Sequence, residues 1–249
     1  MSYFLKDDIR ALQDGDAQAT RDRVRQQFYD LHEKVYKQIN VLDIDLSIIK
    51  PSSQVIQQET VSQHNEHNLF AVQYLRSRGQ AVAIERLMGR EEVASLNNII
   101  TRLHPVIEIR LSEAGLTLEL IIAPDAWWDQ QNVNGKLSIP HHRQGFYRLL
   151  QELDARYCMG FWQGIHLSEM HLKGRYFQHP RILDEWLSTF EPRADWFRIG
   201  IWYAFDEDAL APDHIVSELV AQVQALYAFY TYFLWTSDNN FRDFSESTL

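Results

Sequence analysis

The feature that most constrains the fold is the stretch HPVIEIRLSEAGLTLELIIAP, in which two apolar segments are joined by a short polar turn. Side chains alternate between the two faces of a β-strand, so an apolar residue at every second position marks one face. If the residues SEAG form the loop, Leu111 lies opposite Leu116 and Ile109 lies opposite Leu118. The two apolar rows then merge into one surface, as a consistent register requires. We therefore predict an antiparallel hairpin over residues 105–123.

The same register predicts an unusual pair on the opposite face of the hairpin. It places Glu108 directly opposite Glu119, where two carboxylates repel each other unless a cation lies close to them. Three interpretations are open. The pair is a solvated charge ladder neutralised by Arg110 and Arg198, or it holds a divalent cation such as Mg²⁺ or Mn²⁺, or one acid keeps the other protonated as a general acid. Glu108 and Glu119 are therefore the candidate catalytic residues.

The rest of the chain predicts helices and strands in an irregular order. Apolar residues at spacings of three and four predict helices over residues 16–39, 90–103, 127–134, 138–153, 180–190 and 213–235. Alternating patterns predict strands over residues 43–50, 69–76 and 195–205. Residues 157–162 and 165–172 fit either two strands broken at Gly164 or one bulged strand. Residues 81–88 fit either a strand or a helix, and Ser138 is the expected cap of the helix that it begins.

This order, with hairpins and without regular alternation of strand and helix, is typical of an α+β fold. We expect a mostly antiparallel (mixed) sheet around the hairpin, flanked by the last predicted strand, with helices packed on at least one face. The length suits a single domain over residues 1–249. It would comprise an N-terminal helical segment over about 1–40 and a polar tail over 237–249.

Composition and charge argue against several classes of protein. A hydrophobic share of 45% and an aromatic share of 12% are typical of a packed core rather than a disordered chain. A net charge of −10 argues against a nucleic-acid-binding protein, which meets phosphates with surplus Lys and Arg. The apolar stretch 219–235 is slightly short for a membrane span of about 20 residues and contains glutamines, so we expect a core helix and no membrane association.

The single cysteine and the N-terminal sequence favour a cytoplasmic protein. Cys158 has no partner for an intrachain disulfide, which fits a reducing compartment. The first residues, MSYFLKDDIRALQDGD, contain acids and no apolar run of signal-peptide length. We therefore expect a soluble cytoplasmic protein.

The histidines offer a second, incomplete metal site. In the segment GIHLSEMHL, Glu169 and His171 fall on the same face of a strand and could supply half of a metal site. The ordinary interpretation is that they are surface or hydrogen-bonded side chains. The sequence has no glycine-rich phosphate loop of Walker or Rossmann spacing and too few cysteines for a multi-cysteine zinc site.

Clustered aromatic residues are the remaining candidates for a binding surface. Trp128, Trp162 and Trp202 each belong to an adjacent pair of aromatic residues, and in such a pair on a strand the two rings point to opposite faces. The ordinary interpretation is a sheet buried on both faces. The functional interpretation is a ligand pocket or a partner interface, where tryptophan is enriched.

Two functional hypotheses follow. The first is a binding or accessory protein without a cofactor, which uses an aromatic-rich sheet face and the polar loop over residues 52–68 to hold a protein partner or a small apolar ligand; a homodimer is compatible with it. The alternative is a divalent-metal-assisted hydrolase centred on Glu108 and Glu119, with Glu169 or His171 contributing. Whether the chain is an enzyme stays open, and the convergence of these acids in space distinguishes the two hypotheses.

Overall fold

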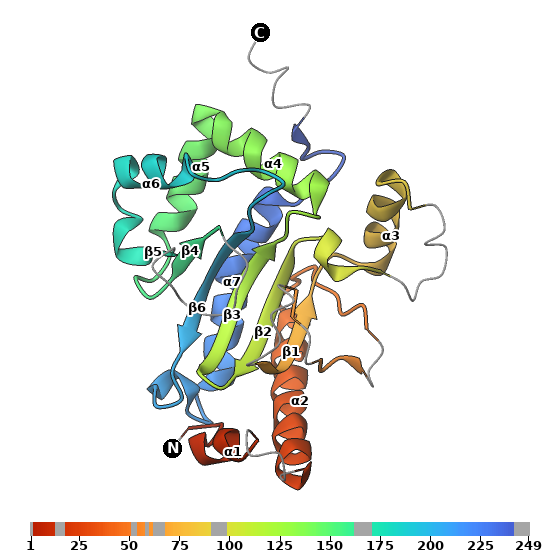
Figure 1. Ribbon diagram of the computed structural model, residues 1–249, viewed down its shortest axis with the longest axis vertical. Helices are drawn as coiled ribbons and strands as arrows, with labels where there is room; N and C mark the ends of the chain where they lie inside the picture. The colour runs from red at the N-terminus through yellow and green to blue at the C-terminus, as the bar shows by residue number, and fades with distance from the viewer. Residues whose placement is uncertain are drawn as a thin grey trace.

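The computed structural model of the chain describes residues 2–12, 18–50, 54–57, 60–61, 68–90, 99–161 and 171–241. Within them a sheet is flanked by helices (Figure 1). The α-helices are α1 (Lys6–Ala11), α2 (Gln18–Val41), α3 (Arg78–Leu87), α4 (Trp127–Ser138), α5 (Pro140–Gln151), α6 (Pro180–Leu187) and α7 (Ile215–Phe233). The strands are β1 (Asn68–Tyr74), β2 (Val106–Ser112), β3 (Gly115–Ile122), β4 (Cys158–Gly160), β5 (His171–Lys173) and β6 (Phe197–Tyr203). Short 3-10 helices are η2 (Thr101–Leu103), η3 (Gly174–Tyr176) and η4 (Asp208–Leu210).

The strands lie in the order β1-β2-β3-β6-β4-β5, and each neighbouring pair is antiparallel. The predicted hairpin is confirmed, because β2 pairs with β3 with Leu111 opposite Leu116 and Glu108 opposite Glu119. β6 lies along the other side of β3, as expected for the last predicted strand. The α+β fold with a largely antiparallel sheet is therefore confirmed.

Gly115 permits the tight turn of the hairpin. Its φ angle is 150°, which L side chains rarely adopt. The carbonyl oxygen of Tyr203 lies 1.9 Å from the place where a Cβ would be. Any side chain at this position would therefore separate the hairpin from β6.

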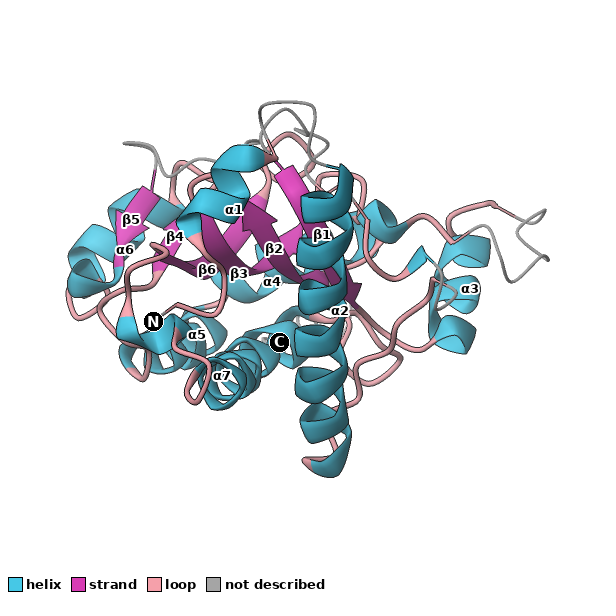
Figure 2. Cartoon of the chain, turned by 90° about the horizontal axis from the view of Figure 1, so that it is seen from below, coloured by secondary structure: helices cyan, strands magenta, loops and turns pink. Residues whose placement is uncertain are grey.

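The apolar face of the sheet packs against helices α2, α5 and α7, which lie together on one side of it (Figure 2). This face carries the merged rows of the hairpin, including Ile109 and Leu118, which are buried with Phe28 of α2 and Phe229 of α7. The opposite face carries the residues of the other parity, and these are largely polar. The prediction of helices on at least one face is confirmed.

Helix α7 is the principal helix against the central hairpin. It covers most of the predicted range 213–235, and Leu219, Val223 and Leu226 are buried in the main core. This bears out the expectation of a core helix. In the described part of the chain, none of the helices combines the length and the apolar character that crossing a membrane requires.

The prediction of a strand from Asp43 to Lys50 is wrong. The segment forms only an isolated bridge between Ser47 and Leu75. The N–H of Leu46 donates to the carbonyl oxygen of Ile44 at 2.8 Å, which bends the backbone tightly. This bend prevents the continuous ladder that the alternating pattern suggested.

Residues 81–88, which fitted either state, lie largely in helix α3. The side chain of Ser77 accepts a hydrogen bond from the N–H of Gln80, and the side chain of Gln80 accepts one from the N–H of Ser77. This reciprocal capping box satisfies two backbone donors at the start of the helix. The spacing Ser-x-x-Gln therefore resolves the ambiguity.

The prediction that Ser138 caps a helix is wrong. Ser138 is the last residue of α4, and its hydroxyl donates to the carbonyl oxygen of Asn134 at 2.7 Å. Pro140 begins α5 and forces Ile139, the residue before it, into an extended conformation (φ −94°, ψ 122°). The break between the helices therefore lies at the residue before the proline, and α4 continues beyond Asn134.

Two further predictions lie partly outside the described residues. A helix was predicted over residues 90–103, and its described C-terminal end is helical only in η2. The backbone is extended at Ile100, whose N–H donates to the buried carboxylate of Glu85 at 2.8 Å. The strands predicted over 157–162 and 165–172 are represented by the short β4 and β5. Residues 162–170 lie outside the described residues.

Replacing Leu226 with Ala should lower the free energy of unfolding by about 2–5 kcal/mol, since Leu226 is 0% exposed and its truncation leaves a cavity. Denaturation in urea measures the difference. As a control, Val41→Ala at the end of α2, where Val41 is 79% exposed, should change the stability by less than about 0.5 kcal/mol. Equal effects of the two substitutions would contradict the placement of α7 in the core.

Candidate functional site

Four charged side chains form one row on the polar face of the sheet. Arg110 Nη1 lies 3.1 Å from Glu108 Oε1, and Arg110 Nη2 lies 3.0 Å from Glu119 Oε2. Arg198 Nη2 lies 2.7 Å from both carboxylate oxygens of Glu119. The row therefore runs Glu108, Arg110, Glu119, Arg198, with alternating sign and no net charge.

Arg110 and Arg198 neutralise the two acids, as the charge-ladder interpretation required, but the row is buried and not solvated. None of its four residues is more than 1% exposed. Burial raises the pKa of Glu108, and Arg110 offsets only part of this effect. Burial acts in the same direction on Glu119, but Arg198 and Arg110 outweigh it and hold the pKa of Glu119 below its usual range. The charged form of Glu119 is thus the one that the fold stabilises.

A glycine in β6 makes room for the row. Gly200 lies opposite Glu119, and a Cβ at this position would come within 2.7 Å of Glu119 Cγ and 2.4 Å of the carbonyl oxygen of Leu118. Because Gly200 has no side chain, the Glu119 carboxylate can extend over β6 to Arg198. The bidentate contact with Arg198 therefore depends on this glycine.

Part of the polar loop predicted over residues 52–68 packs on the same face. The N–H of Val61 and the side-chain amide of Gln73 each donate to Glu108 Oε2 at 3.0 Å. With Arg110, they give this buried carboxylate three donors, as a buried charge requires. The role of the loop as a binding element stays a prediction.

Glu108 and Glu119, the acids that the metal hypothesis requires, contact guanidinium groups. Among the residues that the structure describes, no group of three or more His, Cys, Asp and Glu side chains could hold a metal ion. His171 lies buried on β5, and its ring packs against Trp202 of β6 with the ring centroids 5.1 Å apart. Glu169 and Trp162 lie outside the described residues.

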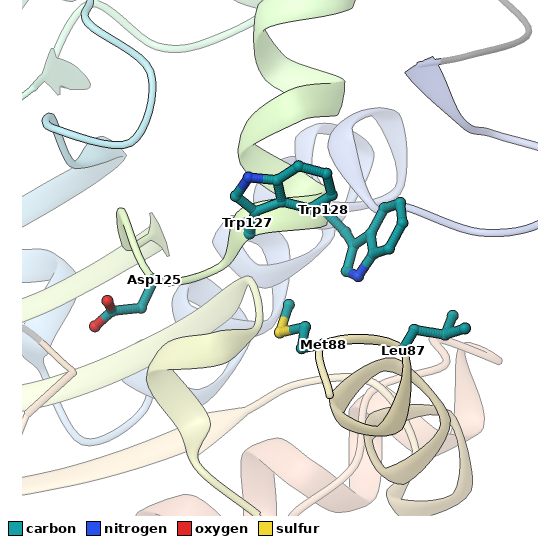
Figure 3. Close-up of a pocket in the computed structure, with 5 residues that line it drawn as sticks. All are labelled: Leu87, Met88, Asp125, Trp127 and Trp128. Carbon is teal, nitrogen blue, oxygen red and sulfur yellow. The ribbon is translucent and has the colours of Figure 1, made fainter. Parts of the chain in front are cut away.

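A pocket of about 440 Å³ lies between the end of α3 and the start of α4 (Figure 3). It is lined by Leu87, Met88, Asp125, Trp127 and Trp128. The two indole rings are nearly perpendicular, with an interplanar angle of 84° and centroids 4.6 Å apart. The walls of the pocket are largely apolar. Leu87 is 56% exposed, so the pocket opens to solvent. Of the two candidate tryptophans that the structure describes, Trp128 and Trp202, Trp128 lines the pocket.

Buried and half-buried hydrogen bonds hold the wall behind Trp128 in place. Asp129 Oδ1 accepts from Arg76 Nη2 at 2.5 Å and from the N–H of Trp235 at 2.7 Å. Arg76 Nη1 donates to the carbonyl oxygen of Trp235 at 3.1 Å, which closes a ring of three residues. The indoles of Trp128 and Trp235 lie with their centroids 5.1 Å apart. The indole of Trp128 therefore packs against a hydrogen-bonded support.

Most of the pocket could not be found from the sequence. The adjacent Trp127 and Trp128, directly after the hairpin, were visible as a signal, and Trp128 was a candidate. Leu87 and Met88 carried no signal, since they lie about 40 residues before the tryptophans and only the fold brings them close.

Comparison with models of known protein families finds no family that matches the chain, and comparison with curated proteins finds no match either. The function is therefore inferred from the residues and their geometry.

Glu119→Gln should lower the free energy of unfolding by about 3–5 kcal/mol, because it leaves the buried Arg110 and Arg198 without a full counter-charge. Glu108→Gln should cost less, because burial already disfavours the charged form of Glu108. Urea denaturation at neutral pH measures both. A larger loss for Glu108→Gln would contradict the central place of Glu119 in the row.

The contribution of Glu119 should disappear in acid. A carboxyl group whose pKa is lowered in the folded state stabilises the fold above its unfolded pKa of about 4.3, and this stabilisation is lost as the pH falls through the folded pKa. The difference in stability between the wild type and Glu119→Gln should therefore shrink below about pH 4. Thermal unfolding as a function of pH measures it, and a difference that grows in acid would contradict the lowered pKa.

Proposed function

We propose that the chain is a binding protein that holds a small apolar ligand in the pocket lined by Trp127 and Trp128. The observation that supports this is the pocket itself, with apolar walls and a volume of about 440 Å³. Ligand pockets commonly have volumes of about 300–1,000 Å³ and are lined by hydrophobic and aromatic side chains with few polar groups. The Arg76–Asp129–Trp235 ring behind the tryptophans adds preorganisation, which lowers the entropic cost of binding.

The charge row supports a structural role for Glu108 and Glu119 rather than the hydrolase alternative. A divalent cation between the two carboxylates would have to displace Arg110, which contacts both of them. The displaced guanidinium of Arg110 would then be a buried positive charge without its carboxylate partners, at a cost of several kcal/mol. We therefore place function in the pocket and stability in the row.

We also propose a cytoplasmic location for the protein. The support is that Cys158 is the only cysteine in the sequence, so that no intrachain disulfide can form, which fits a reducing compartment. A protein partner and a homodimer stay predictions.

The proposal is tested by titration with N-phenyl-1-naphthylamine, an uncharged dye that fluoresces more strongly in apolar surroundings. The wild type should bind it saturably. Trp128→Ala should weaken binding about tenfold or more, equivalent to about 1.4 kcal/mol or more, because it removes a large part of the apolar wall. Leu87→Gln should also weaken binding and leave the fold intact, because Leu87 is largely exposed.

The matched control is Trp186→Ala, which removes a half-buried tryptophan of α6 outside the pocket. This variant should keep the affinity of the wild type. Unchanged affinity in both Trp128→Ala and Leu87→Gln, or equal losses in all three variants, would overturn the proposal.

A further inference from the structure

One of the described residues that line the pocket carries a carboxylate. Of the five described residues that line the pocket, Asp125 is the one that carries a charge, and the others are two indoles, a thioether and an aliphatic side chain. In Figure 3 the Asp125 carboxylate points away from the indoles. The carboxylate therefore lies beyond the indoles, at the edge of the pocket lining, where it contacts Arg102.

The Asp125 carboxylate is held by an exchangeable partner. Arg102 Nε, from η2, lies 3.1 Å from Asp125 Oδ2, and the two side chains are 42% and 51% exposed. Exposed ion pairs of this kind contribute little net stability because water competes for both charges. A ligand cation could replace the guanidinium at small cost, and it would meet the geometry that a guanidinium already satisfies.

The tryptophans are compatible with the same sign of charge, although the carboxylate that would pair with it points away from them. The faces of an indole ring carry partial negative charge, and tryptophan is the strongest aromatic partner of cations. Trp127 and Trp128 lie nearly perpendicular to each other and expose parts of both rings to the pocket. The thioether of Met88 adds a polarisable contact. An anionic group would meet a carboxylate and these ring faces, so the lining disfavours it.

We propose that the ligand of this pocket is an elongated organic cation. Its apolar or aromatic body would pack against Trp127, Trp128 and Met88, and its ammonium, amidinium or guanidinium end would pair with Asp125 in place of Arg102. This inference rests on the proposed binding function and adds the chemical class of the ligand to it.

The test is a series of three phenylalkyl compounds that differ in charge: 4-phenylbutylamine, 4-phenylbutan-1-ol and 4-phenylbutyrate. Isothermal titration calorimetry at neutral pH and low salt measures their affinities for the intact protein. The amine should bind at least about tenfold more tightly than the alcohol, and the carboxylate most weakly. Added salt should reduce the advantage of the amine and leave the affinity of the alcohol nearly unchanged.

Two substitutions separate the role of Asp125 from shape alone. Asp125→Asn should bring the affinity of the amine close to that of the alcohol. Arg102→Gln removes the competing guanidinium and should tighten binding of the amine several-fold. Asp213→Asn, an exposed carboxylate outside the pocket with the same change in net charge, should leave the series unchanged.

The outcomes distinguish the two proposals. Equal affinity for the amine and the alcohol, tighter binding of the carboxylate, or an amine preference that survives Asp125→Asn would overturn the cationic ligand and leave the apolar pocket standing. If neither the naphthylamine dye nor any of the three compounds binds, the binding function fails and the inference falls with it.

Discussion

The centre of the sheet depends on the neutralisation of two acids that the hairpin places opposite each other. Glu108 and Glu119 are tolerated in the interior because Arg110 lies between them and Arg198 completes the row. A slip of one residue in the pairing of the strands would turn these charged side chains toward the helices and expose the apolar rows. Burial of the apolar rows already favours this register, and the charged row makes the preference stronger.

Much of this arrangement could be predicted, because strand parity is a local property. The hairpin, its register and the opposition of Glu108 and Glu119 follow from alternation alone. Burial of the row could not be predicted, since it depends on what covers the polar face and on Gly200, which lets Glu119 reach Arg198. Local patterns also gave wrong predictions in two other places. A backbone hydrogen bond between Ile44 and Leu46 replaces the expected strand pairing, and Pro140 sets the boundary between two helices.

The candidate site likewise has one part that the local sequence predicts and another part that only the tertiary fold brings together. Trp128 was identified because two tryptophans follow a strand directly, and aromatic pairs are visible in any sequence. The pocket around it combines residues from two helices and a turn, and its support comes from Arg76 at the end of β1 and Trp235 beyond α7. Such convergence is a property of the tertiary fold, and no pattern in a short window of sequence encodes it.

The support of the pocket also has a consequence for biosynthesis. The three hydrogen bonds of the Arg76–Asp129–Trp235 ring join residues that are 53, 106 and 159 positions apart. Trp235 leaves the ribosome well after Arg76 and Asp129, and closing such long loops carries an entropic cost that earlier packing has to offset. A nascent chain that contains both tryptophans of α4 but not yet Trp235 lacks the wall behind them. The wall behind the tryptophans consequently forms only after Trp235 has been made and has packed.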